Sequence, residues 1–154
     1  MKTLILYATK HGATAKIAQQ IADKISDATV HDLAQPAPDL AGYDCIIVGS
    51  AVYAGMFRKE VKAFLSQNAD ILKNKTLGLF ASGMSKSEAD KVFTENVPSE
   101  ILQSSKATML LGGIFDPQKA NLAERLIMKA VTKQSGYVDT IDNEKITEFA
   151  EAIE

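Results

Sequence analysis

The sequence has no tryptophan, one cysteine and four prolines, and charge of neither sign dominates it. Its 17 basic residues nearly balance 19 acidic ones, for a formal net charge of -2, so the chain lacks the broad basic field that binds nucleic acid. Aromatic residues make up only 6% and form no cluster for base stacking. No apolar run approaches the roughly 20 residues that a membrane-spanning helix requires. Nucleic-acid binding and transmembrane functions are therefore disfavoured.

The single cysteine, Cys45, begins the apolar segment Cys45-Ile46-Ile47-Val48. With no second cysteine to form a disulfide, it is expected to be a small buried apolar residue in a protein of the reducing cytoplasm. A length of 154 residues with 46% hydrophobic composition suffices for one sizeable core. We therefore expect a single domain over residues 1–154.

Apolar, β-favouring segments recur along the chain, separated by longer stretches with helical periodicity. They lie at residues 3–8, 29–33, 45–49, 76–81 and 107–112. Four of the five are nearly continuous apolar runs, which is typical of parallel strands covered by helices on both faces. A last helix is expected at residues 143–152. The pattern predicts an α/β fold: a doubly wound, five-stranded parallel sheet in the order 2-1-3-4-5, in a three-layer α/β/α arrangement.

A hydroxyl-rich loop joins the first expected strand to the first helix. It comprises Thr9, Lys10, His11, Gly12, Ala13 and Thr14, and we call it the phosphate loop. Threonine hydroxyls, a glycine that permits a sharp turn and the free N–H groups of a helix start together favour an anion such as a phosphate monoester. The alternative is a tight turn with a helix cap. The loop matches neither the nucleoside triphosphate nor the dinucleotide pattern.

Two further loops should reach the same sheet edge, because they follow the third and fourth strands. Their residues are Ser50, Ala51, Val52, Tyr53, Ala54 and Gly55, and Ser82, Gly83 and Met84. Tyr53 and the Met84 thioether are suited to contact a flat heteroaromatic ring, with backbone groups near Ser82 and Gly83 as hydrogen-bond partners. A phosphate at one loop and a ring at the other two describe flavin mononucleotide (FMN). Alternatively, Tyr53 covers the sheet edge and Ser82-Gly83 is a plain helix entry. No acid–base or metal cluster accompanies these loops, so we expect neither catalytic side chains nor a metal.

The phosphate loop, together with Gly49-Ser50-Ala51-Val52-Tyr53-Ala54-Gly55 and Lys59-Glu60-Val61-Lys62-Ala63-Phe64, resembles the flavodoxin-domain family across essentially the whole chain. Within the family the chain is most similar to the branch of quinone-linked protoporphyrinogen dehydrogenases. That similarity rests on Glu124-Arg125-Leu126-Ile127-Met128-Lys129, which resembles the late insertion of the branch.

The resemblance implies that the phosphate loop holds the FMN phosphate and that residues 50–55 and 82–84 hold the isoalloxazine ring. Two positions depart from the family. His11 stands where typical flavodoxins have threonine or serine, and Ser82-Gly83-Met84 stands where many carry an aromatic residue. His11 either adds positive charge to phosphate binding or is a solvent-exposed loop residue.

A helical insertion is expected around residues 116–136. Residues 119–133 are locally basic, with Arg125, Lys129 and Lys133 at helical spacing, and Leu122, Leu126, Ile127, Ala130 and Val131 could form an apolar side. One interpretation is a surface helix that packs this side on the domain. Alternatively, the helix contacts a membrane surface or borders a hydrophobic substrate site.

These features favour an FMN-dependent oxidoreductase, related to protoporphyrinogen IX dehydrogenase, with a quinone acceptor. Its partners would be a small-molecule donor or redox partner and the inner face of the cell membrane, with no nucleic acid. The alternatives are an electron carrier, which the balanced charge makes less suited to steering toward basic partners, and a flavin-free binding or signalling domain on the same fold.

Overall fold

The computed structural model describes residues 1–85, 89–132 and 136–154. Its sheet contains β1 (Thr3–Ala8), β2 (Ala28–Asp32), β3 (Cys45–Tyr53), β5 (Thr76–Ser82) and β6 (Ala107–Leu110), all parallel and in the order β2-β1-β3-β5-β6. These are the five expected strands in the expected order. The doubly wound α/β fold predicted from the sequence is confirmed.

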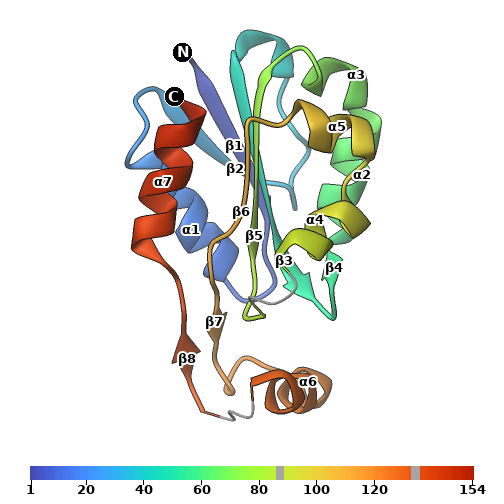
Figure 1. Ribbon diagram of the computed structural model, residues 1–154, viewed down its shortest axis with the longest axis vertical. Helices are drawn as coiled ribbons and strands as arrows, with labels where there is room; N and C mark the ends of the chain where they lie inside the picture. The colour runs from blue at the N-terminus through green and yellow to red at the C-terminus, as the bar shows by residue number, and fades with distance from the viewer. Residues whose placement is uncertain (86–88, 133–135) are drawn as a thin grey trace.

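Helices cover both faces of this sheet (Figure 1). One face carries α1 (Ala13–Ala22) and α7 (Asn143–Ile153). The other carries α2 (Lys59–Gln67), α3 (Ala69–Leu72), α4 (Ala89–Asn96) and α5 (Ser99–Ser104), and the short 3₁₀ helix Leu40–Gly42 precedes β3.

Successive residues of the central strands point into two different cores. Leu4 and Leu6 of β1 belong to the core beneath α2–α5, whereas Ile5 between them belongs to the core beneath α1 and α7. All three are fully buried. Because side chains alternate across a strand, a strand covered on both faces must be apolar at every position, which explains the continuous runs in the sequence. Cys45 is likewise fully buried, and burial raises the pKa of its thiol.

The third strand extends beyond its expected end at residue 49. It continues to Tyr53 and pairs antiparallel with β4 (Met56–Phe57). Ala54 and Gly55 connect the two strands with positive φ angles of 50° and 76°. The turn matches the twist of a tight hairpin, so the segment expected as a loop is a rigid β-hairpin.

The second extension follows β6. The strands β7 (Ile114–Phe115) and β8 (Val138–Asp139) pair antiparallel, and between them lies α6 (Leu122–Thr132), within the insertion expected at 116–136. Residues 133–135 of that segment lie outside the described residues. In Figure 1 these strands form an arm that carries α6 beyond the end of the sheet where β1, β3 and β5 finish.

Candidate functional site

The phosphate loop is shaped by contacts within itself. Gly12 adopts φ 103° and ψ -12°, a left-handed conformation that a residue with a Cβ rarely takes. Its N–H donates a hydrogen bond of 2.9 Å to Oγ1 of Thr9. The Thr9 hydroxyl therefore closes the loop and keeps its own hydrogen for a further acceptor.

Thr14, in the first turn of α1, has a fully buried hydroxyl. Its Oγ1 has no hydrogen-bond partner among the described residues. No side chain caps α1 and no acidic residue lies in its first turn, so the N–H groups at the helix start remain open and the positive end of the helix dipole is not neutralised. An unpaired buried hydroxyl is costly, and a bound anion would satisfy it together with these N–H groups.

A cavity of about 460 Å³ adjoins this loop. Its size falls in the range of cofactor sites. The wall includes every residue that the sequence predicted for the site except Gly12 and Ser50. Three segments far apart in the sequence thus meet at the ends of β1, β3 and β5.

Ser50 and Gly83 make contacts that differ from those expected. Ser50 is fully buried; its hydroxyl donates to the carbonyl of Ala51 (2.9 Å) and accepts from the N–H of Arg58 (2.8 Å). It therefore holds the hairpin instead of lining the cavity. The N–H of Gly83 donates to the carbonyl of Gly112 at 3.0 Å, because the chain after β6 continues to pair beside β5. That N–H is not free for a ligand ring.

Tyr53 ends β3 at the cavity wall, and Nζ of Lys10 lies 4.6 Å from the centroid of its ring. This cation–π contact joins the phosphate loop to the hairpin. The hairpin is fixed from behind by buried Asn96 of α4, whose amide donates to the carbonyl of Gly55 (2.8 Å) and accepts from the N–H of Phe57 (3.0 Å). The aromatic side chain is thus held on a rigid support.

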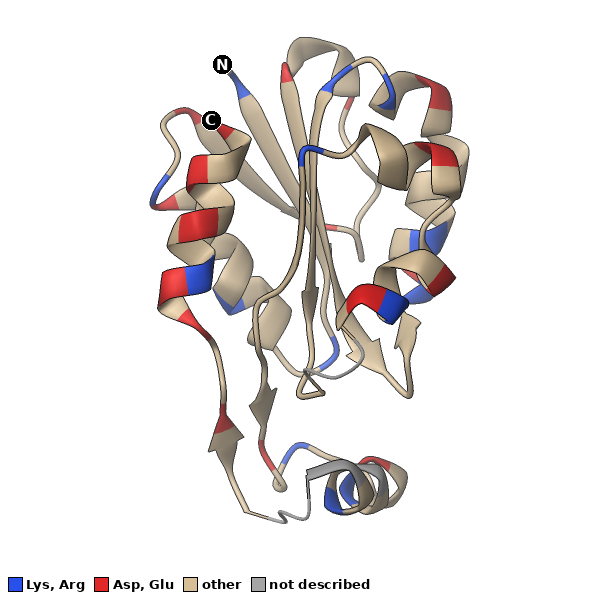
Figure 2. Ribbon diagram, viewed as in Figure 1, with Lys and Arg blue, Asp and Glu red and all other residues tan. Residues whose placement is uncertain are grey.

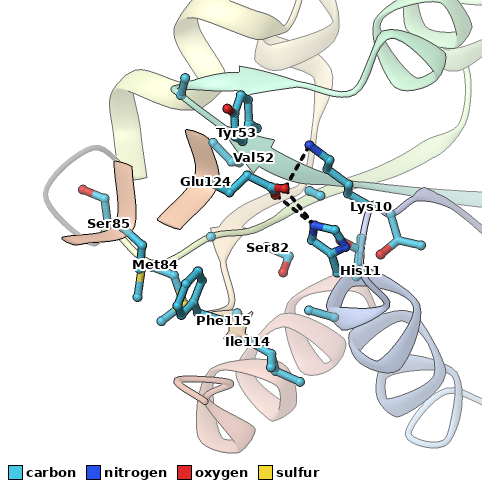
Figure 3. Close-up of a pocket in the computed structure, with 18 of the residues that line it drawn as sticks. Lys10, His11, Val52, Tyr53, Ser82, Met84, Ser85, Ile114, Phe115 and Glu124 are labelled. Carbon is cyan, nitrogen blue, oxygen red and sulfur yellow. Dashed lines mark hydrogen bonds and ion pairs between the residues drawn. The ribbon is translucent and has the colours of Figure 1, made fainter. Parts of the chain in front are cut away.

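Glu124 of α6 points toward Lys10 and His11 of the phosphate loop (Figure 3). Its Oε2 lies 2.9 Å from Nε2 of His11 and its Oε1 3.3 Å from Nζ of Lys10. Asn121 positions it through a capping box: the Asn121 side chain accepts from the N–H of Glu124 (2.8 Å), and the Glu124 carboxylate accepts from the N–H of Asn121 (3.2 Å).

The electrostatic balance at Glu124 favours its charged form. Burial acts to raise the pKa of this carboxyl, but the hydrogen bonds from Asn121, His11 and Lys10 outweigh burial and hold the pKa below its ordinary value. His11, for which the sequence left two roles open, therefore pairs with a carboxylate of this same chain.

An apolar wall closes the cavity on the side of the arm. Its members are Met84, Ile114, Phe115, Ala120 and Met128. Phe115, Ala120 and Met128 are buried and form a small core of their own, and Met84 packs against it from the loop after β5. The hydroxyl of Thr140 contacts Sδ of Met84 at 3.6 Å. The wall is built by β7, by Ala120 and Met128 of the insertion, and by Met84.

The structure adds cavity residues that the sequence did not predict. Those on the sheet and its helices are Arg58, Ser85, Lys91, Val92, Glu95 and Leu110, and those on the arm and α6 are Gly113, Ile114, Phe115, Asp116, Ala120, Glu124 and Met128. The Asn121-x-x-Glu124 capping box could have indicated where α6 begins, but not what Glu124 contacts.

Among the residues that the structure describes, no group of three or more His, Cys, Asp or Glu side chains is arranged to hold a metal ion. Within the same described residues, no helix is long and apolar enough to cross a bilayer.

A doubly wound sheet with a glycine-containing loop between β1 and α1, and a cavity at the ends of β1, β3 and β5, defines an α/β protein of the flavodoxin-like class. The family model described as Flavodoxin domain matches residues 4–141. The chain belongs to the flavodoxin-domain family, as its sequence motifs had indicated.

Known proteins resemble it along most of its length. Protoporphyrinogen IX dehydrogenase [quinone] of Escherichia coli (strain K12) is 24% identical over 174 residues, covering 99% of this chain and 94% of that protein. Oxidised Flavodoxin 2 from Bacillus cereus superimposes with a TM-score of 0.63 at 22% identity, covering 99% and 97% of the two chains. A flavoprotein in complex with FMN from Lactobacillus acidophilus NCFM gives a TM-score of 0.50 at 21% identity, covering 73% and 91%.

Proposed function

We propose that residues 1–154 act as one FMN-binding domain, with the helical insertion at 116–136. The phosphate would be held by Thr14, the N–H groups at the start of α1 and the Thr9 hydroxyl, and the ring by Tyr53 and the segment 82–84. The unpaired, fully buried hydroxyl of Thr14 supports this assignment most directly. Family membership and the FMN of the Lactobacillus acidophilus flavoprotein agree with it.

We further propose that the chain is an enzyme, an FMN-dependent oxidoreductase that oxidises a large apolar donor of the protoporphyrinogen class and reduces a quinone. The apolar wall carries this proposal, because Ile114 and Phe115 of β7 and Met128 of α6 offer a hydrophobic surface beside the cavity. The name of the Escherichia coli relative supports the same donor and acceptor. The proposal places the chain in the cytoplasm, at the inner face of the cell membrane, where quinones dissolve.

Bound FMN would supply the redox chemistry, accepting a pair of electrons and releasing them. The side chains would bind, orient and exclude water. Lys10 and Tyr53 fix one side of the cavity through their cation–π contact, while the apolar wall keeps the opposite side dry. No side chain is assigned as a proton donor or acceptor.

An electron carrier is the second candidate, and one observation favours it: the chain matches nearly the whole of Bacillus cereus Flavodoxin 2, 99% against 97%. Against it, a net charge of -2 provides little long-range steering toward a basic partner. A flavin-free binding domain is the third candidate; unless it binds another anion, it leaves the buried Thr14 hydroxyl unpaired.

Anaerobic mixing of the FMN-loaded chain with protoporphyrinogen IX and menaquinone separates these candidates. Porphyrin fluorescence that requires both FMN and quinone supports the enzyme. The variant Ile114→Ser should keep FMN and lose turnover, because it alters only the apolar wall. Reduction of the flavin by other donors, with no porphyrin formed in the wild type, would instead identify a carrier.

A further inference from the structure

The outer face of α6, which we define as Leu122, Arg125, Leu126 and Lys129, points away from the cavity. Leu122 and Leu126 are 72% and 61% exposed, so the described residues leave most of their surface uncovered. Four positions separate the two leucines, and Lys129 follows the second by three, which places them along one side of the helix. The expectation that Leu122 and Leu126 pack on the domain is therefore wrong, although α6 does pack on it through Met128. The side chains of Ile127 and Val131, expected on the same apolar side, lie outside the described part of the structure.

Charge is distributed unequally around this helix. Glu124 is the only acidic residue in the sequence of α6, and it faces inward to His11 and Lys10 with 11% of its side chain exposed. Lys129 is exposed, and so is Arg125, whose guanidinium also donates to the carbonyl of Pro117. In Figure 2 the basic segments of α6 lie on the side away from the sheet and the acidic segment on the side toward it. The outer face thus combines two leucines with positive charge and no acid.

We infer that the outer face of α6 docks on the surface of an anionic lipid bilayer. Exposed leucines enter the boundary between headgroups and acyl chains, while flanking basic residues meet negative headgroups. Each basic residue near such a surface strengthens binding about fivefold, equivalent to about 1 kcal/mol. Tyr137, which is 62% exposed, directly precedes β8 of the arm that carries α6, and it offers an amphipathic ring for the interface.

The position of α6 links this surface to the cavity. Its inner side carries Glu124 and Met128, which line the cavity, while its outer face contacts the bilayer. Docking therefore sets the apolar wall beside the membrane phase. A quinone dissolved in the lipid would approach the cavity from that side. The role of membrane docking therefore rests on the proposed function, the reduction of a quinone.

Sedimentation with vesicles tests the docking surface on the FMN-loaded full chain. Vesicles of equal parts phosphatidylcholine and phosphatidylglycerol should bind the chain at least tenfold more tightly than pure phosphatidylcholine, and high salt should weaken the binding. The double variant Leu122→Ser/Leu126→Ser should bind at least tenfold more weakly, and Lys129→Gln about fivefold.

Matched controls replace residues of the same kind elsewhere. Ile71→Ser removes an apolar side chain that is 46% exposed on α3, and Lys24→Gln removes an exposed charge after α1. Both should bind vesicles as the wild type does. FMN content and circular dichroism verify that each variant is folded.

The inference would be overturned if the wild-type chain bound neither vesicle type, or if the leucine variants bound vesicles as tightly as the wild type does. So would a dimer in solution that the leucine variants dissociate, because the face would then join two copies. Turnover with a water-soluble quinone, measured without vesicles, tests the proposed function separately. If this turnover is absent while the chain still binds vesicles, the proposed function fails and the docking inference stands.

Discussion

Glu124 and His11 are bound to each other across 113 positions of sequence, with Oε2 of the carboxylate 2.9 Å from Nε2 of the imidazole. This contact holds α6, which lies at the end of the arm, against the phosphate loop. Together with the packing of Met84 on Phe115 and Met128, it sets how the insertion lies over the site. Among the described residues, α6 is therefore held over the site by the ion pairs of Glu124 with His11 and Lys10 and by this apolar packing.

Replacing Glu124 with glutamine should loosen α6 without unfolding the sheet. Partly exposed ion pairs contribute on the order of 1 kcal/mol or less, so we expect amide hydrogen exchange in α6 to quicken by up to about fivefold. The control Glu95→Gln alters a carboxylate of α4 that lines the same cavity. Unchanged exchange in α6 of Glu124→Gln would show that the apolar contact alone holds the helix.

Acid should release the same contact. Because the pKa of Glu124 in the folded chain lies below its ordinary value of 4.5, the ion pairs contribute fully above that pH and are lost as the pH falls through the lowered pKa. Carboxyl ¹³C chemical shifts should therefore give Glu124 a titration midpoint below 4.5. A midpoint at or above that value would mean that the pairs do not stabilise the charged form.

Thr14→Val should weaken FMN binding about 10- to 100-fold, because a hydrogen bond to a charged group contributes roughly 1.5–3 kcal/mol. Valine has nearly the same shape, and the hydroxyl it replaces has no partner, so stability should not fall. Thr3→Val is the matched control, since Thr3 is equally buried at the opposite end of β1. Isothermal titration of both variants checks the prediction; equal affinities would remove Thr14 from the phosphate site.

Gly112→Ala should destabilise the arm. Gly112 has φ 87°, and an added Cβ would lie 2.0 Å from the carbonyl oxygen of Thr140, part of the backbone leading from β8 to α7. Backbone strain of this kind costs about 1–3 kcal/mol before the clash is counted. Gly42→Ala is the control, because nothing lies within 4 Å of its added Cβ. Urea unfolding should shift for Gly112→Ala alone.

The sequence predicted those parts of the fold that hydrophobic patterning determines. The alternation between two cores makes Leu4, Ile5 and Leu6 consecutive apolar residues, and the same rule located four of the five parallel strands. The extent of β3 was not predicted, because Ala54 and Gly55 read equally well as an open loop or as a hairpin turn. Only the pairing of Tyr53 with Met56 distinguishes the two.

The loop at residues 9–14 could be proposed as a phosphate site from the sequence, because its candidate donors are neighbours in the chain. Contacts between segments that are far apart in the sequence could not be predicted in this way. Neither the pairing of Glu124 with His11 nor the burial of Ser50 behind the hairpin leaves a periodic signal. The exposure of Leu122 and Leu126 could not be predicted either, because an amphipathic pattern does not say which side of the helix packs on the domain.

Titration of the flavin-free chain with FMN and, separately, with riboflavin tests the central claim most directly, because the two ligands share a ring and differ in the phosphate. The structure predicts that FMN binds one per chain, with its fluorescence altered, and far more tightly than riboflavin. Failure to bind FMN, or equal affinity for both ligands, would contradict the assignment of the loop at Thr9–Thr14 as a phosphate site.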